Sequence, residues 1–263
     1  MGAGAQPGPP SFARMAADPL RWRLLRELAC SDRRVRELVT LVGQPQNLVS
    51  YHLGRLRASG LVVARRSSFD GRDTYYRLDL TRCAQSLAEA GAALHPGLRS
   101  APAQVSAPSA LPPEGGPVLF LCTGNSARSQ VAEALVRVRA QGRIPAFSAG
   151  SHPKPLHPNV ERVLASRGIE PAGQRSKHLS VFADRRFSYV ITLCDRVREV
   201  SPDFPGRPAY LHWSVPDPAA ATGDQEDTYP RFEAMAAELE TRIGFWLATV
   251  GPGSTRSPVQ EVS

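Results

Sequence analysis

Apolar residues recur at helical spacing in the first quarter of the chain. The run from Leu20 to Leu28 follows Asp18-Pro19, a pair that is typical of a helix start. A second periodic run, from Val35 to Val42, is followed by Gly43-Gln44-Pro45, which should end it. A third helix is expected from about residue 46 to residue 59, because Gly60 is a typical helix stop.

Two short segments after these helices have the composition of β-strands. Residues 61–66 and 74–78 are rich in β-branched, aromatic and basic residues, and they flank the turn dipeptide Asp70-Gly71. A final helix is expected at about 82–94. Two helices joined by a short glycine-containing turn and followed by a hairpin predict an α+β winged helix-turn-helix, whose second helix enters the major groove of DNA.

The expected recognition helix has an apolar and a polar face. Its apolar face, directed to the core, should consist of Leu48, Val49, Leu53 and Leu56. The residues expected to contact DNA are Gln46, Asn47, Ser50, Tyr51 and Arg55 on the helix and Arg65, Arg66 and Arg72 on the hairpin. Arginines on a hairpin are well placed for phosphates, which contribute affinity but no sequence information.

The second half of the chain alternates apolar strands with helices. Strands are expected at 118–121, 146–148, 189–193 and 209–213, and helices at 129–139, 158–167 and 228–250, the last with Pro230 in its first turn. Short apolar strands separated by helices predict an α/β domain with a four-stranded parallel sheet flanked by helices.

Composition separates these two regions. The segment from Pro96 to Pro117 contains six prolines and no apolar periodicity, so a linker is expected at 96–116, between domains at 11–95 and 117–250. Residues 1–10 and 251–263 are expected to be disordered. Neither a signal peptide nor an apolar run of bilayer length is found, so a cytoplasmic location with no membrane partner is expected.

The positive charge is concentrated in the first part of the chain. The net charge is +8, of which residues 1–100 carry +7 (15 basic against 8 acidic residues) and the remainder +1 (17 against 16). A basic front half joined to a nearly neutral back half is typical of a nucleic-acid-binding module joined to another domain.

Several residues of the expected recognition helix carry a resemblance to a known family. Gln46, Val49-Ser50, His52-Leu53, Leu56 and Ser59-Gly60-Leu61-Val62 resemble the signature of the ArsR family of winged-helix repressors, over about residues 11–95. This resemblance implies a homodimer, paired through its first and last helices, on a two-fold DNA operator. It also implies a packing role for His52.

The chain departs from this family where many members sense soft metals. At the positions of the Cys-x-Cys pair that binds arsenite or metal, the chain has Arg34 and Arg36, which cannot bind a soft cation. Cys30 and Cys83 are isolated in the sequence. No metal site is therefore expected, and the sequence leaves the inducer undefined.

The first expected strand of the back domain leads directly into a reactive motif. Cys122 and Arg128 are separated by five residues and followed by Ser129. The amides of such a loop can surround a tetrahedral oxyanion at a helix N-terminus, and the guanidinium adds a planar donor pair. The same field favours the nucleophilic thiolate. The residues expected to bind the oxyanion are Thr123, Gly124, Asn125, Ser126, Ala127 and Ser129.

This motif and its position resemble the low-molecular-weight tyrosine phosphatase fold, over about residues 117–250. The fold includes phosphatases and thiol-linked arsenate reductases. In the reductases, the position of Cys194 in Thr192-Leu193-Cys194-Asp195 holds the thiol that attacks a Cys–arsenic adduct and forms a disulfide. Asp217, in the reductase-like His212-to-Pro218 segment, matches the general acid of both branches. Cys194 as an ordinary small buried residue is the alternative.

Two further comparisons with the reductases remain open. Ser201 stands where thioredoxin-coupled reductases have a third cysteine, so reduction would require a low-molecular-weight thiol with a glutaredoxin-like partner, or direct thioredoxin attack on a Cys122–Cys194 disulfide. Asn125, Glu133 and Ser148 match positions that some reductases use for structural hydrogen bonds or for a potassium ion.

Together these patterns predict an ArsR-type regulator with a thiol-dependent arsenate reductase domain. Cys122, Arg128, Cys194 and Asp217 are the expected catalytic residues, and no tightly bound cofactor is expected. Protein tyrosine phosphatase activity in the same domain is one alternative. A non-enzymatic oxyanion or redox sensor that controls DNA binding is the other.

Overall fold

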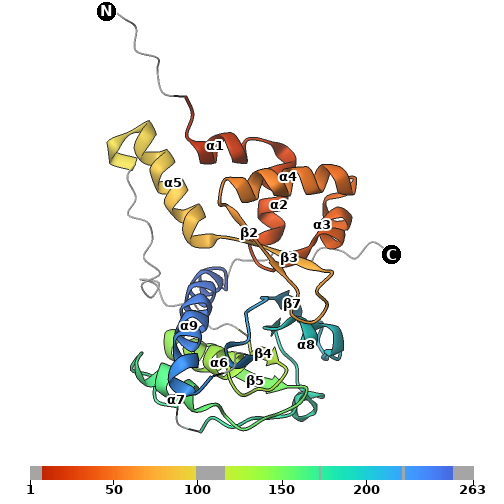
Figure 1. Ribbon diagram of the computed structural model, residues 1–263, viewed down its shortest axis with the longest axis vertical. Helices are drawn as coiled ribbons and strands as arrows, with labels where there is room; N and C mark the ends of the chain where they lie inside the picture. The colour runs from red at the N-terminus through yellow and green to blue at the C-terminus, as the bar shows by residue number, and fades with distance from the viewer. Residues whose placement is uncertain (1–7, 99–115, 172, 221–222, 251–263) are drawn as a thin grey trace, which may run out of the picture. The chain divides into compact units, whose positions relative to one another are not determined.

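The computed structural model describes residues 8–98, 116–171, 173–220 and 223–250. The chain divides into two compact units, which are described in turn (Figure 1). Residues 1–7 and 251–263 of the expected tails and most of the expected linker lie outside the described residues, whereas residues 8–10 lead directly into α1. Within the linker range, Pro96–Leu98 forms a 3-10 helix, η1.

The first unit contains five helices among its described residues. They are α1 (Ser11–Ala16), α2 (Pro19–Leu28), α3 (Val35–Val42), α4 (Gln46–Ala58) and α5 (Leu80–Leu94). Asp18 caps α2 by accepting the backbone N–H of Arg21 at 2.9 Å, as expected of an Asp-Pro start. Gly43 ends α3 in the left-handed region, with φ of 61°, and so turns the chain into α4. Helix α1 was not predicted.

Three strands complete this unit as an antiparallel sheet in the order β1-β3-β2. They are β1 (Arg33–Arg34), β2 (Val62–Arg66) and β3 (Thr74–Leu78). The predicted hairpin is present, but Asp70-Gly71 is not a two-residue turn. Pairing stops at Arg66 and Thr74, so residues 67–73 form a longer loop, and Gly71 lacks the positive φ that a tight turn of this type requires.

The core of the first unit lies between α2, α3 and α4. Leu24, Leu38 and Leu56 are fully buried there, and His52 is buried beside them, in agreement with a packing role. The prediction for Leu48 is wrong, since it is 38% exposed. Its position at the third residue of α4 lies before the first full turn, where a side chain can remain outside the groove between neighbouring helices.

The second unit is built on a four-stranded parallel sheet in the order β5-β4-β6-β7. Its strands are β4 (Val118–Cys122), β5 (Ala146–Gly150), β6 (Tyr189–Thr192) and β7 (Ala209–His212). The central strand β4 is buried along its whole length, because helices cover both faces of such a sheet. This is the fold class that the alternation of strands and helices predicts.

Four α-helices surround the sheet in the described residues: α6 (Arg128–Arg139), α7 (Pro158–Ala165), α8 (Asp195–Val200) and α9 (Gln225–Leu247). Helices α6, α7 and α9 pack against one another, and α8 contacts β4 and β6 (Figure 1). Two 3-10 helices, η2 (Leu179–Phe182) and η3 (Pro218–Ala220), lie in the connections. Helix α8 was not predicted.

Helix α9 begins three residues before its predicted start. Asp224 forms a reciprocal capping box with Asp227, so the helix starts at Gln225. Pro230 consequently lies in the second turn and not in the first, which corrects the prediction. None of the helices within the described ranges has the length and apolarity needed to cross a bilayer.

Candidate active site

The candidate site lies where the central strand of the second unit leads into a helix. Cys122 is the last residue of β4, and α6 begins at Arg128. Residues 123–127 form the loop between them, which we call the oxyanion loop. The carboxyl edge of a parallel sheet is where such folds place their ligands, because loops and helix N-termini converge there.

The carbonyl groups of the oxyanion loop point outward. Three of them accept backbone N–H groups from the neighbouring segment 152–157: Thr123 from His152 at 2.9 Å, Gly124 from Lys154 at 2.9 Å and Ser126 from His157 at 3.0 Å. In a trans peptide the following N–H points opposite to the carbonyl. The amides of Gly124, Asn125 and Ala127 are therefore directed away from this segment, as a loop that encloses an anion requires.

Asn125 holds the loop in its curved conformation. It is fully buried and has a left-handed backbone, with φ of 44°, which Asn tolerates better than most residues. Its side-chain oxygen accepts the backbone N–H of Lys177 at 2.7 Å and the Gln130 amide at 3.2 Å. The left-handed residue of the loop is thus Asn125 and not the neighbouring Gly124.

The side-chain amide of Asn125 orients a second group, the hydroxyl that contacts the nucleophile. It donates to Ser129 Oγ at 2.8 Å, so the Ser129 hydroxyl proton remains for another acceptor. Cys122 Sγ lies 3.0 Å from that Oγ. Ser129 is thus placed to donate to the sulfur, an arrangement that stabilises a thiolate.

A glycine in the neighbouring strand permits the loop to pack closely. Gly150, at the end of β5, is buried, and a Cβ built there would lie 2.6 Å from the Thr123 carbonyl oxygen and 2.7 Å from the Asn125 nitrogen. Any side chain at this position would displace the oxyanion loop. Sequence reasoning missed Gly150, although the small residues Ser148-Ala149-Gly150 at a strand end are consistent with close backbone approach.

Arg128 lies beside the loop as a buried, oriented cation. Its guanidinium is 5% exposed and donates to the Val215 carbonyl at 3.1 Å and to Asp217 Oδ2 at 2.9 Å. The buried Nε makes no hydrogen bond within the described ranges. The structure therefore brings Asp217 to the same site, and Arg128 retains a buried donor that an oxyanion would satisfy.

The second cysteine reaches the other end of the loop. Cys194 follows β6, and its Sγ lies 3.2 Å from the Thr123 hydroxyl, next to Cys122 in sequence. Burial raises the pKa of the Cys194 thiol above its usual value, while Arg128 and the Thr123 hydrogen bond lower it in part. Cys122 and Cys194 are both free, buried thiols. Parallel strands thus bring two cysteines 72 positions apart to one loop.

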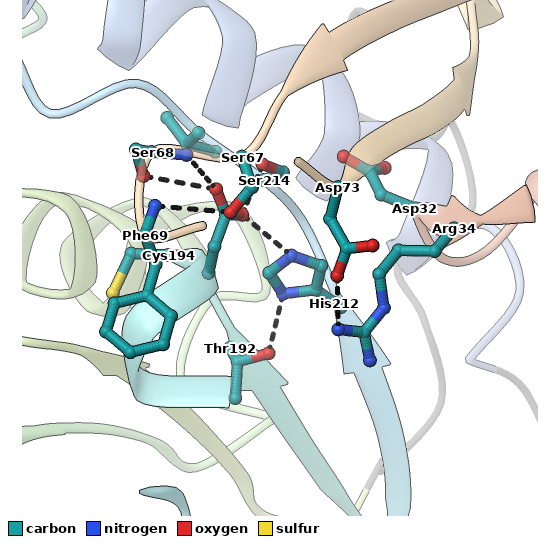
Figure 2. Close-up of polar contacts among 12 residues, drawn as sticks. Asp32, Arg34, Ser67, Ser68, Phe69, Asp73, Thr192, Cys194, His212 and Ser214 are labelled. Carbon is teal, nitrogen blue, oxygen red and sulfur yellow. Dashed lines mark hydrogen bonds and ion pairs between the residues drawn. The ribbon is translucent and has the colours of Figure 1, made fainter. Parts of the chain in front are cut away.

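A buried polar group anchors the chain directly after Cys194. His212 lies between Thr192 Oγ1, 2.8 Å from its Nδ1, and Asp195 Oδ1, 3.1 Å from its Nε2 (Figure 2). Ser214 donates to the same Asp195 oxygen at 2.5 Å. Burial alone would raise the pKa of Asp195, but the hydrogen bonds from His212 and Ser214 hold it well below its usual range. These contacts fix the backbone at the start of α8.

The first unit presents the expected DNA-facing residues on its surface. Seven of the eight expected residues are exposed and Arg65 is half-buried; the exposed ones are Gln46, Asn47, Ser50, Tyr51, Arg55, Arg66 and Arg72. Arg34 and Arg36, at the positions of the family's cysteine pair, bind Asp73 at 2.9 and 3.3 Å, and Figure 2 shows the Arg34–Asp73 pair. No cluster of three metal-ligating side chains occurs in the part of the chain that the structure describes.

Comparison with known proteins agrees with this geometry. Residues 117–255 match the family model for low molecular weight phosphotyrosine protein phosphatase, and residues 18–63 match the bacterial regulatory protein, arsR family. A protein from Halalkalibacterium halodurans, named arsenate reductase, is 32% identical over 126 residues, which cover 48% of this chain and 91% of that protein. A Bacillus subtilis protein of the same name is 31% identical over the same length and coverage.

Solved structures of the same kinds of protein also match the second unit. The tyrosine phosphatase Wzb from Escherichia coli K30, in complex with sulphate, is 22% identical, with a TM-score of 0.44 over 52% of this chain and 99% of that one. An arsenate reductase from Archaeoglobus fulgidus is 32% identical, with a TM-score of 0.40 over 50% of this chain and 98% of that one.

Proposed function

Because the chain belongs to the low molecular weight phosphotyrosine protein phosphatase family and carries an ArsR-family helix-turn-helix before that domain, we propose that it is a DNA-binding regulator fused to a thiol-dependent arsenate reductase. The observation that supports reduction over hydrolysis is the position of Cys194. Its thiol contacts Thr123 of the oxyanion loop, whereas hydrolysis of a phosphate ester needs no second thiol.

The proposed reaction starts at Cys122. Its thiolate attacks arsenic, held by the loop amides and Arg128, and Asp217, as the general acid, passes a proton to the departing hydroxide, which leaves as water. The product is a Cys122–arsenic bond with arsenic still pentavalent. The Cys194 thiolate then attacks Cys122 Sγ, a disulfide forms, and the electron pair of the S–As bond stays on arsenic, which leaves as arsenite.

An external thiol must then reduce the disulfide. We propose direct attack by thioredoxin or by a low-molecular-weight thiol with a glutaredoxin-like protein, because Ser201 offers no third sulfur. Ser201 lies directly after α8 and is half-buried. No tightly bound cofactor enters this scheme.

The first unit would form a homodimer, and each copy would contact DNA through α4 and the β2–β3 hairpin. The exposed polar residues of α4 support direct contact with bases, and Arg66 and Arg72 support contact with flanking phosphates. A regulator of this kind acts in the cytoplasm, where thiols are kept reduced.

Substitution of the second thiol tests the proposed reduction. We expect Cys194→Ser to abolish arsenate-dependent thiol consumption under multiple turnover and to leave p-nitrophenyl phosphate hydrolysis within about twofold of wild type, because only the reduction needs a second sulfur. Cys122→Ser, the matched control, should abolish both activities. Equal retention of both activities in Cys194→Ser would show that Cys194 is not the second thiol of the reaction, and hydrolysis without any arsenate-dependent thiol consumption in wild type would identify the domain as a phosphatase.

The remaining alternative is a sensor without turnover. It is supported by the same loop, since a loop that binds an oxyanion need not catalyse. In that case, arsenate or peroxide would shift operator affinity in wild type while thiol consumption stayed at the background rate. Measurable turnover that requires Cys122 excludes it.

A further inference from the structure

A lysine side chain ends the hydrogen-bond network behind the oxyanion loop. Lys177 Nζ lies 3.5 Å from Glu133 Oε2 and donates to the Arg175 carbonyl at 3.2 Å. Both side chains of this ion pair are largely buried, at 18% and 14% exposure. The ammonium group therefore lies between a carboxylate oxygen and a carbonyl oxygen, which are the kinds of atom that also bind monovalent metal cations.

A series of hydrogen bonds connects this ion pair to Cys122, and each hydrogen bond in it has a defined donor and acceptor. Glu133 accepts the Ser148 hydroxyl at 2.5 Å, so Ser148 must accept from elsewhere, and it does so from the Asn125 amide at 2.9 Å. The same amide donates to Ser129, whose hydroxyl faces Cys122 Sγ. Glu133 thus accepts at one end of this series of hydrogen bonds, and the Asn125 amide donates to both serines.

Lys177 supports this arrangement of donors and acceptors through two groups, its backbone N–H and its ammonium. Its backbone N–H donates to Asn125 Oδ1, which assigns the other end of that side chain as the donating NH₂ group. Its ammonium neutralises Glu133, a carboxylate that would otherwise be buried without a counterion. A largely buried charge is costly without such a partner, so the ion pair keeps the Glu133 carboxylate in place as the acceptor of the Ser148 hydroxyl.

The residues that match a reductase potassium site therefore do not fit potassium in this chain. Asn125, Glu133 and Ser148 are present, but the ammonium of Lys177 already binds the one carboxylate. A second cation on the same carboxylate would be repelled by the ammonium at short range in a medium of low dielectric constant. No step of the reaction is therefore assigned to a metal ion.

We propose that Lys177 is the resident cation of the oxyanion loop, a positioning residue that makes the enzyme independent of potassium. The inference rests on the proposed catalytic role of this loop. It concerns the state of the loop and not the choice between arsenate and phosphate esters, so it can be tested with either substrate.

The test compares potassium with choline chloride at equal ionic strength. Hydrolysis of p-nitrophenyl phosphate, arsenate-dependent thiol consumption and the Tm of the full chain are measured in both salts. Wild type should show the same kcat/KM and Tm in the two salts. Lys177→Arg, which keeps the charge, should behave in the same way.

Charge reversal at position 177 should make activity and Tm depend on potassium. Lys177→Asp places a second carboxylate beside Glu133, so we expect its kcat/KM to fall in choline and to recover about tenfold in potassium, with a higher Tm in potassium. Lys154→Asp is the matched control, because Lys154 is exposed and is the only other lysine in the sequence. It should show no potassium response.

Two results would overturn the inference. One is a potassium-dependent rise in wild-type activity or Tm, a measurement that needs no variant. The other is a folded Lys177→Asp protein that responds to potassium no more than Lys154→Asp. A wild-type protein with neither activity would refute the proposed function. The test of Lys177 would still be possible, because Tm reports on cation binding without turnover.

Discussion

The two thiols of the candidate site differ in their surroundings. Cys122 lies next to the Ser129 hydroxyl and the loop amides, whereas Cys194 lies at the start of α8, where burial raises the pKa of its thiol. Arg128 and Thr123 offset this increase only in part. The raised pKa of the Cys194 thiol matters only for a reaction that uses this second thiol.

We expect the pH dependence of the two activities to differ for this reason. Attack by Cys194 requires its thiolate, and a raised pKa means that the thiolate fraction keeps increasing as pH passes the usual cysteine value of about 8.5. The single-turnover rate of arsenite release should rise across this range. Hydrolysis of p-nitrophenyl phosphate should lack that rise, and Cys194→Ser should leave its pH profile unchanged. Parallel profiles would count against attack by Cys194.

Individual residues also show where sequence reasoning stopped. The Cys122-to-Ser129 motif indicated the nucleophile, the arginine and the oxyanion loop, because their chemistry depends on local spacing. Lys177 and Gly150 gave no comparable indication, since each acts through contact with a loop about 25 to 50 residues away. Only the fold shows that they face Asn125.

At the scale of elements, the N-terminus of α7 contributes a titratable group next to the site. His157 is the N-cap of this helix: its Nδ1 accepts the Asn159 N–H at 3.2 Å, and its ring stacks on Phe232. Burial lowers the pKa of His157, although the nearby Asp217 carboxylate opposes the decrease. The folded protein therefore binds a proton at this imidazole less readily than the unfolded chain does.

The lowered pKa of His157 predicts a loss of protein stability in mild acid. The contribution of His157 to stability is complete above its unfolded pKa of about 6.5 and declines as pH falls from there towards the lower folded pKa. His157→Asn keeps an N-cap acceptor and removes the titration. We expect its free energy of unfolding, measured by urea denaturation, to fall less than that of wild type between pH 7 and pH 5. An identical fall would contradict the assignment.

The predicted elements succeeded where periodicity was strong and failed where a few contacts decided the outcome. The four strands of the parallel sheet and the helices α2, α3 and α4 follow from apolar spacing. Helices α1 and α8 have six residues each, too few for a periodic pattern. The wide loop at 67–73 replaced the tight turn that Asp70-Gly71 suggested, because strand pairing ends at Arg66 and Thr74.

For the molecule as a whole, the uneven charge predicts which unit would supply the electrostatic part of the proposed DNA binding. Residues 1–100 carry a net charge of +7 and the remaining residues +1, so the electrostatic part of DNA binding should come from the first unit. Each phosphate contact releases condensed counterions and steepens the dependence of affinity on salt.

Removal of one phosphate contact should therefore change the salt dependence of DNA affinity by a defined amount. We expect Arg66→Ala to reduce the slope of log K against log salt for double-stranded operator DNA by about 1, measured by fluorescence anisotropy. Arg231→Ala removes the same charge from an exposed position on α9 in the second unit and should leave the slope unchanged. Equal slopes for both variants and wild type would exclude a phosphate contact at Arg66.

The sequence by itself determined the class of each domain, the order of the main elements and the motif that joins Cys122 to Arg128. These features depend on periodicity and on residues close together in the chain, which a linear pattern retains. Tertiary structure decided which distant side chains meet: Cys194 at Thr123, Asp217 at Arg128 and Lys177 at Glu133. Parallel strands end at one edge whatever their separation in sequence, so the choice of neighbours there depends on sheet order and loop path.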